Sequence, residues 1–344
     1  MKPKTGVFLI NLGTPDSPET PDVRRYLKEF LMDPRVIDIP FWKRFLLIHL
    51  IIAPFRSPKS SHEYKKLWTA EGSPLLVYGE KLRDLLQKSL GENFKVVLGM
   101  RYQSPSIKTT LKEFEGSGIK QLVVIPLYPQ YASASTGSTI EKVLDELKQW
   151  ETYPRLNVIS QFFDHPFFLE AFAQNALKCM EQNNYDHILF SYHGLPERQI
   201  LKSSSGSCQL NQKCCSMYHA KNIYCYRAQC YQTSRLLAEK INLKESDYTV
   251  CFQSRLGRDP WIKPFTDEVI SQLAKQGKKK ILALSPSFVA DCLETTVEIG
   301  QTYDELFRKE GGERLDLVES LNVQPQWIEC LKSLVLENDS QILN

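Results

Sequence analysis

A repeated alternation of short apolar strands with helical segments constrains the fold of this 344-residue chain more than any other feature. Two long stretches, 21–32 and 166–182, carry apolar residues at helical spacing. Short apolar runs lie around them, at 7–10, 96–100, 122–127, 156–159, 188–190, 248–253 and 280–284. Strands that alternate with helices predict parallel sheets covered by helices. Because the pattern runs twice, we predict an α/β fold of two parallel-sheet lobes, with the active-site cleft between them.

The repeat also predicts how the chain divides into domains. We expect an N-terminal α/β lobe over residues 1–160, which includes the most apolar stretch of the sequence. A second α/β lobe is expected over 161–310. Residues 311–344 are expected to form a C-terminal segment that packs back on the lobes.

Charge and composition exclude some classes of partner and location. The formal net charge is +3, from 43 basic and 40 acidic residues, so no basic stripe predicts a nucleic-acid partner. No apolar run approaches the roughly 20 residues that a membrane span needs, and the first residues lack signal-peptide features. We therefore expect a cytoplasmic protein, in which the nine cysteines are thiols or metal ligands rather than disulfides.

The most apolar stretch, residues 41–55, allows two interpretations. It is either a buried helix, or an apolar lip that opens on a membrane surface or a greasy ligand. In the second case Trp42, Lys43 and Arg44 suit the interface, and the protein would sit peripherally at the inner face of the membrane. Sequence alone does not separate the two.

A histidine follows one of the predicted strands. His193 comes after the run 188–190, in Ser191-Tyr192-His193-Gly194-Leu195-Pro196. In open α/β sheets ligands bind at the carboxyl ends of strands, so an imidazole here is well placed for chemistry. A single histidine is more often a structural or surface group, however, so the assignment depends on its partners.

Acidic residues follow another strand. Asp291, Glu294 and Glu298 come after the run 280–284, and on an α-helix they would share one face. Such a face is either a solvated surface that complements the helix dipole, or a functional group opposite His193. An imidazole that faces a carboxylate binds a divalent ion, moves protons, or does both.

Five of the nine cysteines gather in the polar segment 208–230. They are Cys208, Cys214, Cys215, Cys225 and Cys230. Core cysteines are normally dispersed, whereas thiolates close together favour an iron–sulfur cluster or structural zinc. Uncoordinated thiols are the remaining alternative.

Six separated motifs, in the same order, resemble the ferrochelatase family, whose members insert iron into a porphyrin in haem synthesis. The resemblance covers nearly the whole chain. The motifs are Asn11-Leu12-Gly13-Thr14-Pro15, Arg101-Tyr102, Tyr128-Pro129-Gln130-Tyr131, Ser191-Tyr192-His193-Gly194-Leu195-Pro196, Gln253-Ser254-Arg255-Leu256-Gly257 and Asp291-Cys292-Leu293-Glu294-Thr295.

The resemblance implies two Rossmann-like lobes, each a parallel sheet flanked by helices, with a porphyrin cleft between them. It implies that His193 contacts the metal and accepts pyrrole protons, that Glu294 stands opposite it, and that Glu298 is the next acid on a carboxylate path. It also implies that four residues line the macrocycle pocket. These are Leu12, Arg101, Tyr102 and Trp261.

Two departures from the family pattern matter. Animal members have a histidine where this chain has Cys292, so metal handling rests more on Glu294. Members that use coproporphyrin tend to carry tyrosine where this chain has Leu12, which favours protoporphyrin.

For the cysteines, the resemblance favours a 2Fe–2S cluster, because some bacterial members carry one on an internal cysteine-rich segment. The ligands we expect are Cys208, Cys215, Cys225 and Cys230, with Cys214 as the substitute for Cys215.

The expected function is insertion of ferrous iron into protoporphyrin IX to give protohaem, the terminal step of haem biosynthesis, with iron(II) as a substrate. A cobalt chelatase of cobalamin synthesis is the alternative enzyme, and a non-catalytic tetrapyrrole carrier is an alternative from another class. A carrier would not need Glu294 and Glu298 opposite His193. The oligomeric state, monomer or homodimer, stays open.

Overall fold

The computed structural model describes residues 4–339 except 205, 207, 256 and 258. Leu256, in one of the six motifs, therefore lies outside the described residues. The chain forms two compact units. Unit 1 contains the described parts of 1–128, 133–161 and 322–344, and unit 2 contains those of 129–132 and 162–321. The predicted domain boundaries at 160 and 310 stay a prediction.

Unit 1 is built on a parallel sheet of four strands in the order β2-β1-β3-β4. The strands are β1 (Thr5–Asn11), β2 (Phe94–Met100), β3 (Gln121–Pro126) and β4 (Arg155–Val158). Strand β1 has neighbours on both edges, with Val7 paired to Val96 on one side and to Val123 on the other. All seven β1 residues are buried, which explains why this strand reads as a continuous apolar run.

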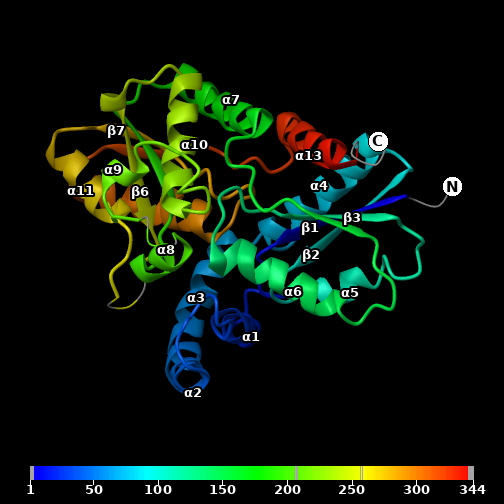
Figure 1. The fold of residues 1–344 in the computed structure, drawn as a ribbon. Coiled ribbons are helices and arrows are strands. Elements are labelled where there is room, and N and C mark those ends of the chain that lie inside the picture. The colour runs from blue at the N-terminus through cyan, green and yellow to red at the C-terminus, as the bar shows by residue number, and fades with distance from the viewer. Residues whose placement is uncertain (1–3, 205, 207, 256, 258, 340–344) are drawn as a thin grey trace. The chain divides into compact units, whose positions relative to one another are not determined.

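Unit 1 also contains α-helices, two of which, at 74–90 and 107–111, pack against β2. In chain order they are α1 (Thr20–Leu31), α2 (Phe41–Leu46), α3 (Ala53–Leu67), α4 (Pro74–Leu90), α5 (Ile107–Leu111), α6 (Ser138–Leu147) and α13 (Pro325–Asp339). Two π-helices, η1 (Leu47–Ile52) and η2 (Ser133–Gly137), lead into α3 and α6. The C-terminal α13 packs against α4, as Figure 1 shows.

Unit 2 repeats the plan with a parallel sheet in the order β6-β5-β7-β8. Its strands are β5 (His187–His193), β6 (Tyr248–Gln253), β7 (Lys280–Leu284) and β8 (Arg314–Leu317). Its helices are α7 (Pro166–Gln182), α8 (Glu197–Ser203), α9 (Gln212–Cys215), α10 (Tyr226–Lys240), α11 (Thr266–Lys275) and α12 (Asp304–Lys309), with a 3₁₀ turn, η3 (Glu245–Asp247), and a π-helix, η4 (Leu293–Tyr303). Leu189, Ile281 and Phe307 belong to its core.

The predicted α/β class with two parallel sheets is confirmed. Strand β8 was not predicted, because its four residues alternate with charges and form no apolar run. The helix that carries the carboxylates also differs from the prediction. It is the π-helix η4 rather than an α-helix, and Asp291 precedes it. The π-helix is rare and is frequently found at functional sites.

The apolar stretch 41–55 runs through α2, η1 and the start of α3 (Figure 1). It is not a buried helix, because Trp42 is 71% exposed and Phe55 79% exposed. The prediction that Arg44 lies at a membrane interface is wrong. Arg44 is buried, and its Nη1 donates to the carbonyl oxygens of Ile37 and Ile39. Among the described residues, no helix is long and apolar enough to cross a membrane.

Candidate active site

His193 is the last residue of β5, and its ring is half-buried. Its Nδ1 lies 2.7 Å from the carbonyl oxygen of Gly194. Since that oxygen can only accept, the tautomer that satisfies it has the proton on Nδ1. Nε2 then keeps a lone pair, which is the form that accepts a proton or binds a metal ion.

The backbone around His193 is fixed on both sides. The Gly194 N–H donates to the Gln253 carbonyl oxygen at 2.8 Å, and the Tyr226 hydroxyl donates to the His193 carbonyl oxygen at 2.9 Å. A Cβ at Gly194 would stand 2.8 Å from the Gln253 oxygen and 3.2 Å from a ring carbon of Trp261. Only glycine allows this approach, which brings the predicted macrocycle residue Trp261 against the histidine loop.

The side chain of Gln253 joins the histidine strand to the carboxylate helix. Its Oε1 accepts from the Ser191 hydroxyl at 2.8 Å, and its Nε2 donates to the backbone carbonyl of Glu294 at 2.9 Å. Gln253 is 1% exposed, so these bonds are shielded from water. The structure therefore connects His193 to the start of η4, although the two segments are about 100 residues apart in the sequence.

Glu298 is held at both carboxylate oxygens. The Ser254 hydroxyl donates to one at 2.5 Å and the Tyr303 hydroxyl to the other at 2.9 Å. Burial and the adjacent Glu298 charge raise the pKa of Tyr303. Ser254 has a φ of 65°, a strained value that concentrates at functional sites. Sequence reasoning assigned no role to Ser254, Tyr303 or Gln253.

In unit 1, Leu12 and the pair Arg101-Tyr102 lie side by side. The Tyr102 N–H donates to the Leu12 carbonyl oxygen at 2.9 Å, and the Arg101 N–H to that of Asn11 at 2.8 Å. Gly13, with a φ of 112°, makes this possible, because a Cβ there would stand 2.0 Å from the Tyr102 oxygen.

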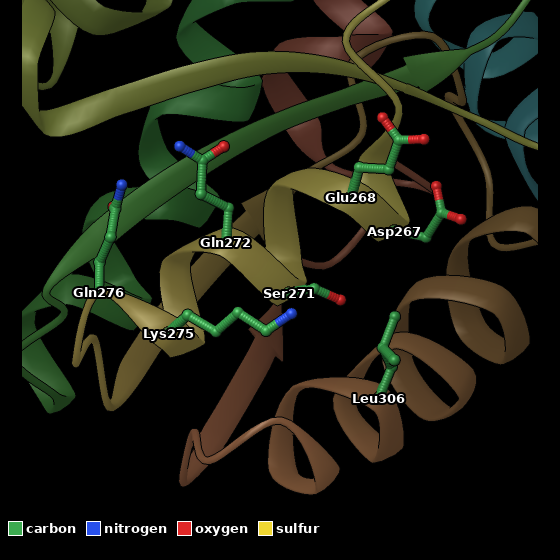
Figure 2. A pocket seen from close by; sticks show the side chains of 7 residues that line it. All are labelled: Asp267, Glu268, Ser271, Gln272, Lys275, Gln276 and Leu306. Carbon is green, nitrogen blue, oxygen red and sulfur yellow. The ribbon is translucent and has the colours of Figure 1, made fainter.

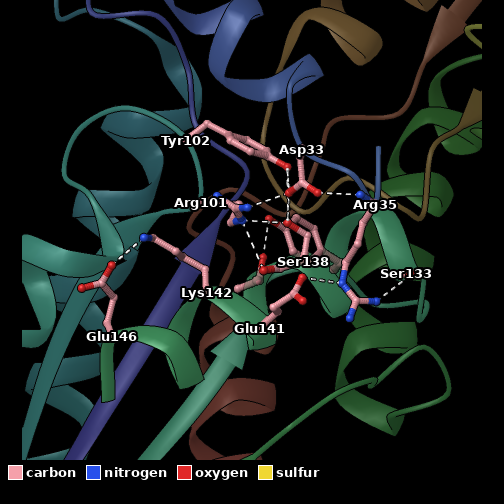
Figure 3. Close-up of polar contacts among 11 residues, drawn as sticks. Asp33, Arg35, Arg101, Tyr102, Ser133, Ser138, Glu141, Lys142 and Glu146 are labelled. Carbon is pink, nitrogen blue, oxygen red and sulfur yellow. Dashed lines mark hydrogen bonds and ion pairs between the residues drawn. The ribbon is translucent and has the colours of Figure 1, made fainter. Parts of the chain in front are cut away.

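A buried carboxylate, Asp33, organises the Arg101-Tyr102 pair (Figure 3). Its Oδ2 accepts from Arg101 Nη2 at 2.6 Å, from the Tyr102 hydroxyl at 2.9 Å and from the Ser138 hydroxyl at 2.5 Å. Its side chain is only 2% exposed. Burial raises the pKa of Tyr102, and the Asp33 charge adds to the rise. Sequence reasoning missed Asp33, because an aspartate before a proline is an ordinary helix end.

In the cysteine segment 208–230, four thiols interact in pairs. Cys214 and Cys215 sulfurs lie 3.8 Å apart, Cys208 interacts with Cys214, and Cys215 with Cys225. A hydrogen bond from the Cys215 thiol lowers the pKa of Cys225, whereas that bond and burial raise the pKa of Cys215.

The fifth cysteine of the segment, Cys230, is in a different environment. It is fully buried, burial raises its pKa, and it interacts with Tyr226. A hollow of about 550 Å³ beside the segment is lined by Cys208, Cys214 and Cys225, but not by Cys230. Within the described parts of the chain, no three His, Cys, Asp or Glu side chains stand close enough together to hold a metal ion.

A second hollow lies on α11 and carries none of the predicted site residues. Its volume is about 490 Å³, and Figure 2 shows its side chains along α11 with Leu306 opposite. It is lined by Asp267, Glu268, Ser271, Gln272, Lys275, Gln276 and Leu306. Its two acids, Asp267 and Glu268, are both paired with Arg255 at the surface, which is the arrangement of a solvated charged face.

Comparison with known proteins identifies relatives over nearly the whole chain. The ferrochelatase family model matches residues 4–339. A ferrochelatase from Legionella pneumophila (strain Paris) is 47% identical over 334 residues, which cover 97% of this chain and 99% of the relative. One from Coxiella burnetii (strain Dugway 5J108-111) is 46% identical over 332 residues, which cover 96% and 93%.

Solved structures show the same fold at low sequence identity. SirB from Bacillus subtilis with Fe³⁺ has a TM-score of 0.54 and 12% identity, with 98% of each chain covered. The sirohydrochlorin chelatase SirB from Bacillus subtilis subspecies spizizenii in complex with cobalt has a TM-score of 0.52 and 10% identity, and the match covers 96% of this chain and 93% of that one.

Removal of the Asp33 carboxylate tests its place in the structure. We expect Asp33→Ala to lower the free energy of unfolding by about 3–5 kcal/mol, because the Arg101 charge would lose its buried partner. Urea denaturation measures the change. The control is Asp16→Ala, which breaks the exposed pair with Arg25 and should cost less than about 1 kcal/mol. Equal losses in both variants would contradict this role for Asp33.

Proposed function

The chain belongs to the ferrochelatase family, and on that premise we propose that it inserts ferrous iron into protoporphyrin IX with His193 as the group that receives the pyrrole protons. The product is protohaem, and iron(II) is a substrate rather than a resident cofactor. The observation that carries the assignment of His193 is its place at the end of β5, joined through Gln253 to the helix of Glu294.

The chemistry explains why such a residue is needed. Two protons must leave the ring nitrogens as the divalent ion enters, so a base is required near the centre of the macrocycle. The Nδ1 contact of His193 with the Gly194 oxygen orients the ring and leaves Nε2 to accept a proton or touch the metal. Distortion of the porphyrin, driven by binding of the rest of the macrocycle, would expose the nitrogen lone pairs.

The carboxylates have separate roles in this proposal. Glu294 contacts the iron, and Glu298, four residues further along η4, relays protons. Ser254 and Tyr303 occupy both oxygens of Glu298, which supports a relay rather than a direct metal ligand. The macrocycle is contacted in this proposal by three of the predicted residues, Leu12, Arg101 and Trp261. Tyr102 is 1% exposed and bonded to Asp33, so we assign it the positioning of Arg101 instead of substrate contact.

An insertion assay tests the central residue. With iron(II) and protoporphyrin, we expect His193→Ala to lower kcat by about 10²- to 10⁴-fold, the usual contribution of general acid–base catalysis. Porphyrin binding, followed by fluorescence, should stay close to that of the unchanged protein. His62→Ala, at an exposed histidine on α3, is the control and should retain activity. Near-normal insertion by His193→Ala would refute the role of His193 as the proton acceptor.

The same assay tests the choice of porphyrin. If the unchanged protein prefers coproporphyrin to protoporphyrin, the role assigned to Leu12 is refuted.

For the cysteine segment we propose a 2Fe–2S cluster. Soft thiolates suit such a cluster, and the Arg227 guanidinium, 3.1 Å from the Cys215 sulfur, would offset part of its negative charge. The pairwise interactions among Cys208, Cys214, Cys215 and Cys225 favour these four as ligands. Cys214 then takes the place that the sequence prediction gave to Cys230.

Visible absorbance and an electron paramagnetic signal after reduction test this ligand set. We expect Cys214→Ser to lose most of the absorbance and Cys230→Ser to keep it. Cys179→Ser, a half-buried cysteine on α7, is the matched control. A colourless protein with stoichiometric zinc would contradict the cluster, and loss of colour only in Cys230→Ser would restore the original ligand set.

For the apolar stretch 41–55 we propose contact with a lipid surface. Six large apolar side chains there are more than half exposed, namely Phe41, Trp42, Leu46, Leu50, Ile51 and Phe55. Single exposed apolar side chains are normal on a protein surface, but six on consecutive helical turns form a patch of the kind that marks an interaction site. Aromatic rings beside Lys43 are suited to the boundary between lipid headgroups and acyl chains.

Sedimentation with vesicles that contain phosphatidylglycerol tests the lipid contact. We expect Trp42→Ala combined with Phe55→Ala to weaken binding by at least about tenfold, since two rings leave the apolar phase. The control is Phe167→Ala, an exposed phenylalanine at the start of α7. Equal binding by all variants, or none by the unchanged protein, would rule the contact out.

A further inference from the structure

We propose that the first turn of α10 couples the thiols of Cys215 and Cys225 to the position of His193, with Tyr226 as the positioning residue. The state of the Cys215 and Cys225 sulfurs would then determine how firmly the histidine is held. The inference rests on the proposed function only for the catalytic role of His193.

Tyr226 is the direct link to the histidine. It is the first residue of α10, it is 6% exposed, and its hydroxyl donates to the His193 carbonyl oxygen at 2.9 Å. That carbonyl belongs to the last residue of β5, where the regular ladder ends. A buried carbonyl without a donor is costly, so this bond holds the end of the strand in place.

The neighbours of Tyr226 on both sides interact with Cys215. Cys225 is the N-cap of α10 and interacts with the Cys215 thiol. Arg227 donates from Nη1 to the Cys215 sulfur at 3.1 Å and to the Asn211 carbonyl oxygen at 3.1 Å. Three consecutive residues therefore join two sulfurs to the catalytic loop.

Arg227 also reaches the segment that carries Trp261. Its Nη2 donates to the Lys263 carbonyl oxygen at 3.1 Å. It also donates from Nη2 to the Tyr231 hydroxyl at 3.3 Å, and because Arg227 is only 5% exposed, its four acceptors share one desolvated guanidinium. A change in charge or bonding at Cys215 therefore alters the other hydrogen bonds of Arg227. The histidine loop and the segment of Trp261 are both attached to this turn, so both respond to the change.

Tight packing explains why such a change would be transmitted. Residues 226–230 are all buried, so the first turn of α10 is enclosed by packed side chains. Closely packed elements shift together rather than deform locally. When the cysteine side moves, the turn either carries the His193 carbonyl with it or breaks the Tyr226 bond.

Hydrogen exchange of the full-length protein, measured by mass spectrometry, tests the coupling without relying on catalysis. The reporter is the peptide around residues 188–196, which contains the Gly194 amide bonded to Gln253. We expect Cys215→Ser to speed its exchange by roughly fivefold to tenfold, as expected for loss of one buried hydrogen bond. The peptide around 314–321, in the same unit, should not change. In a Tyr226→Phe background the same Cys215→Ser change should have no further effect.

Kinetics and absorbance supply a second, independent readout. Tyr226→Phe should lower kcat severalfold, leave the KM for porphyrin unchanged and keep the absorbance of the cysteine site. The matched control is Tyr185→Phe, which removes a hydroxyl bonded to Asp316 at 2.7 Å elsewhere in unit 2 and should leave kcat unchanged. If Cys215→Ser does not fold, Arg227→Gln removes the same contact.

Unchanged exchange of peptide 188–196 in Cys215→Ser and Arg227→Gln would overturn the proposal. The proposal would also be overturned if Cys215→Ser sped the exchange of this peptide equally in the presence and in the absence of the Tyr226 hydroxyl. If the unchanged protein inserts no metal, the proposed function fails, but the exchange experiment still decides whether the coupling exists.

Discussion

The buried amide of Gln253 is the interaction on which the candidate site depends. It closes the end of β6, accepts from the Ser191 hydroxyl on β5 and donates to the Glu294 carbonyl at the start of η4, while its own carbonyl accepts from Gly194. Strands β5 and β6 are already paired in the sheet, and the Gln253 side chain and backbone attach the start of η4 and the turn after β5 to that pair. Every proposed role of His193 and Glu294 requires that these segments hold their positions.

The two units show how one topology supports different chemistry. Both sheets place their first strand second in the order, and both follow that strand with a Gly-x-Pro turn. The residue before the glycine is Leu12 in unit 1 and His193 in unit 2. Both also place a π-helix after the third strand, but only the one in unit 2 carries Glu294. Function therefore follows the side chains at equivalent turns, not the fold itself.

Periodicity predicted seven of the strands within a few residues, because buried parallel strands read as continuous apolar runs. It did not predict β8, whose residues alternate, or the π-helical form of η4, since α and π periods cannot be separated over 11 residues. His193 and Glu294 were identifiable from their motifs and their place after strands. Asp33, Ser254 and Tyr226 were not, because their importance lies in partners that only the folded chain brings near.

A crystal structure with metal-free protoporphyrin bound would test the central claim most directly. The account predicts a pyrrole nitrogen within hydrogen-bond reach of His193 Nε2, about 2.6–3.2 Å, with the Gly194 and Gln253 bonds intact. A macrocycle bound with its centre away from His193, while the complex is still able to take up iron, would contradict it.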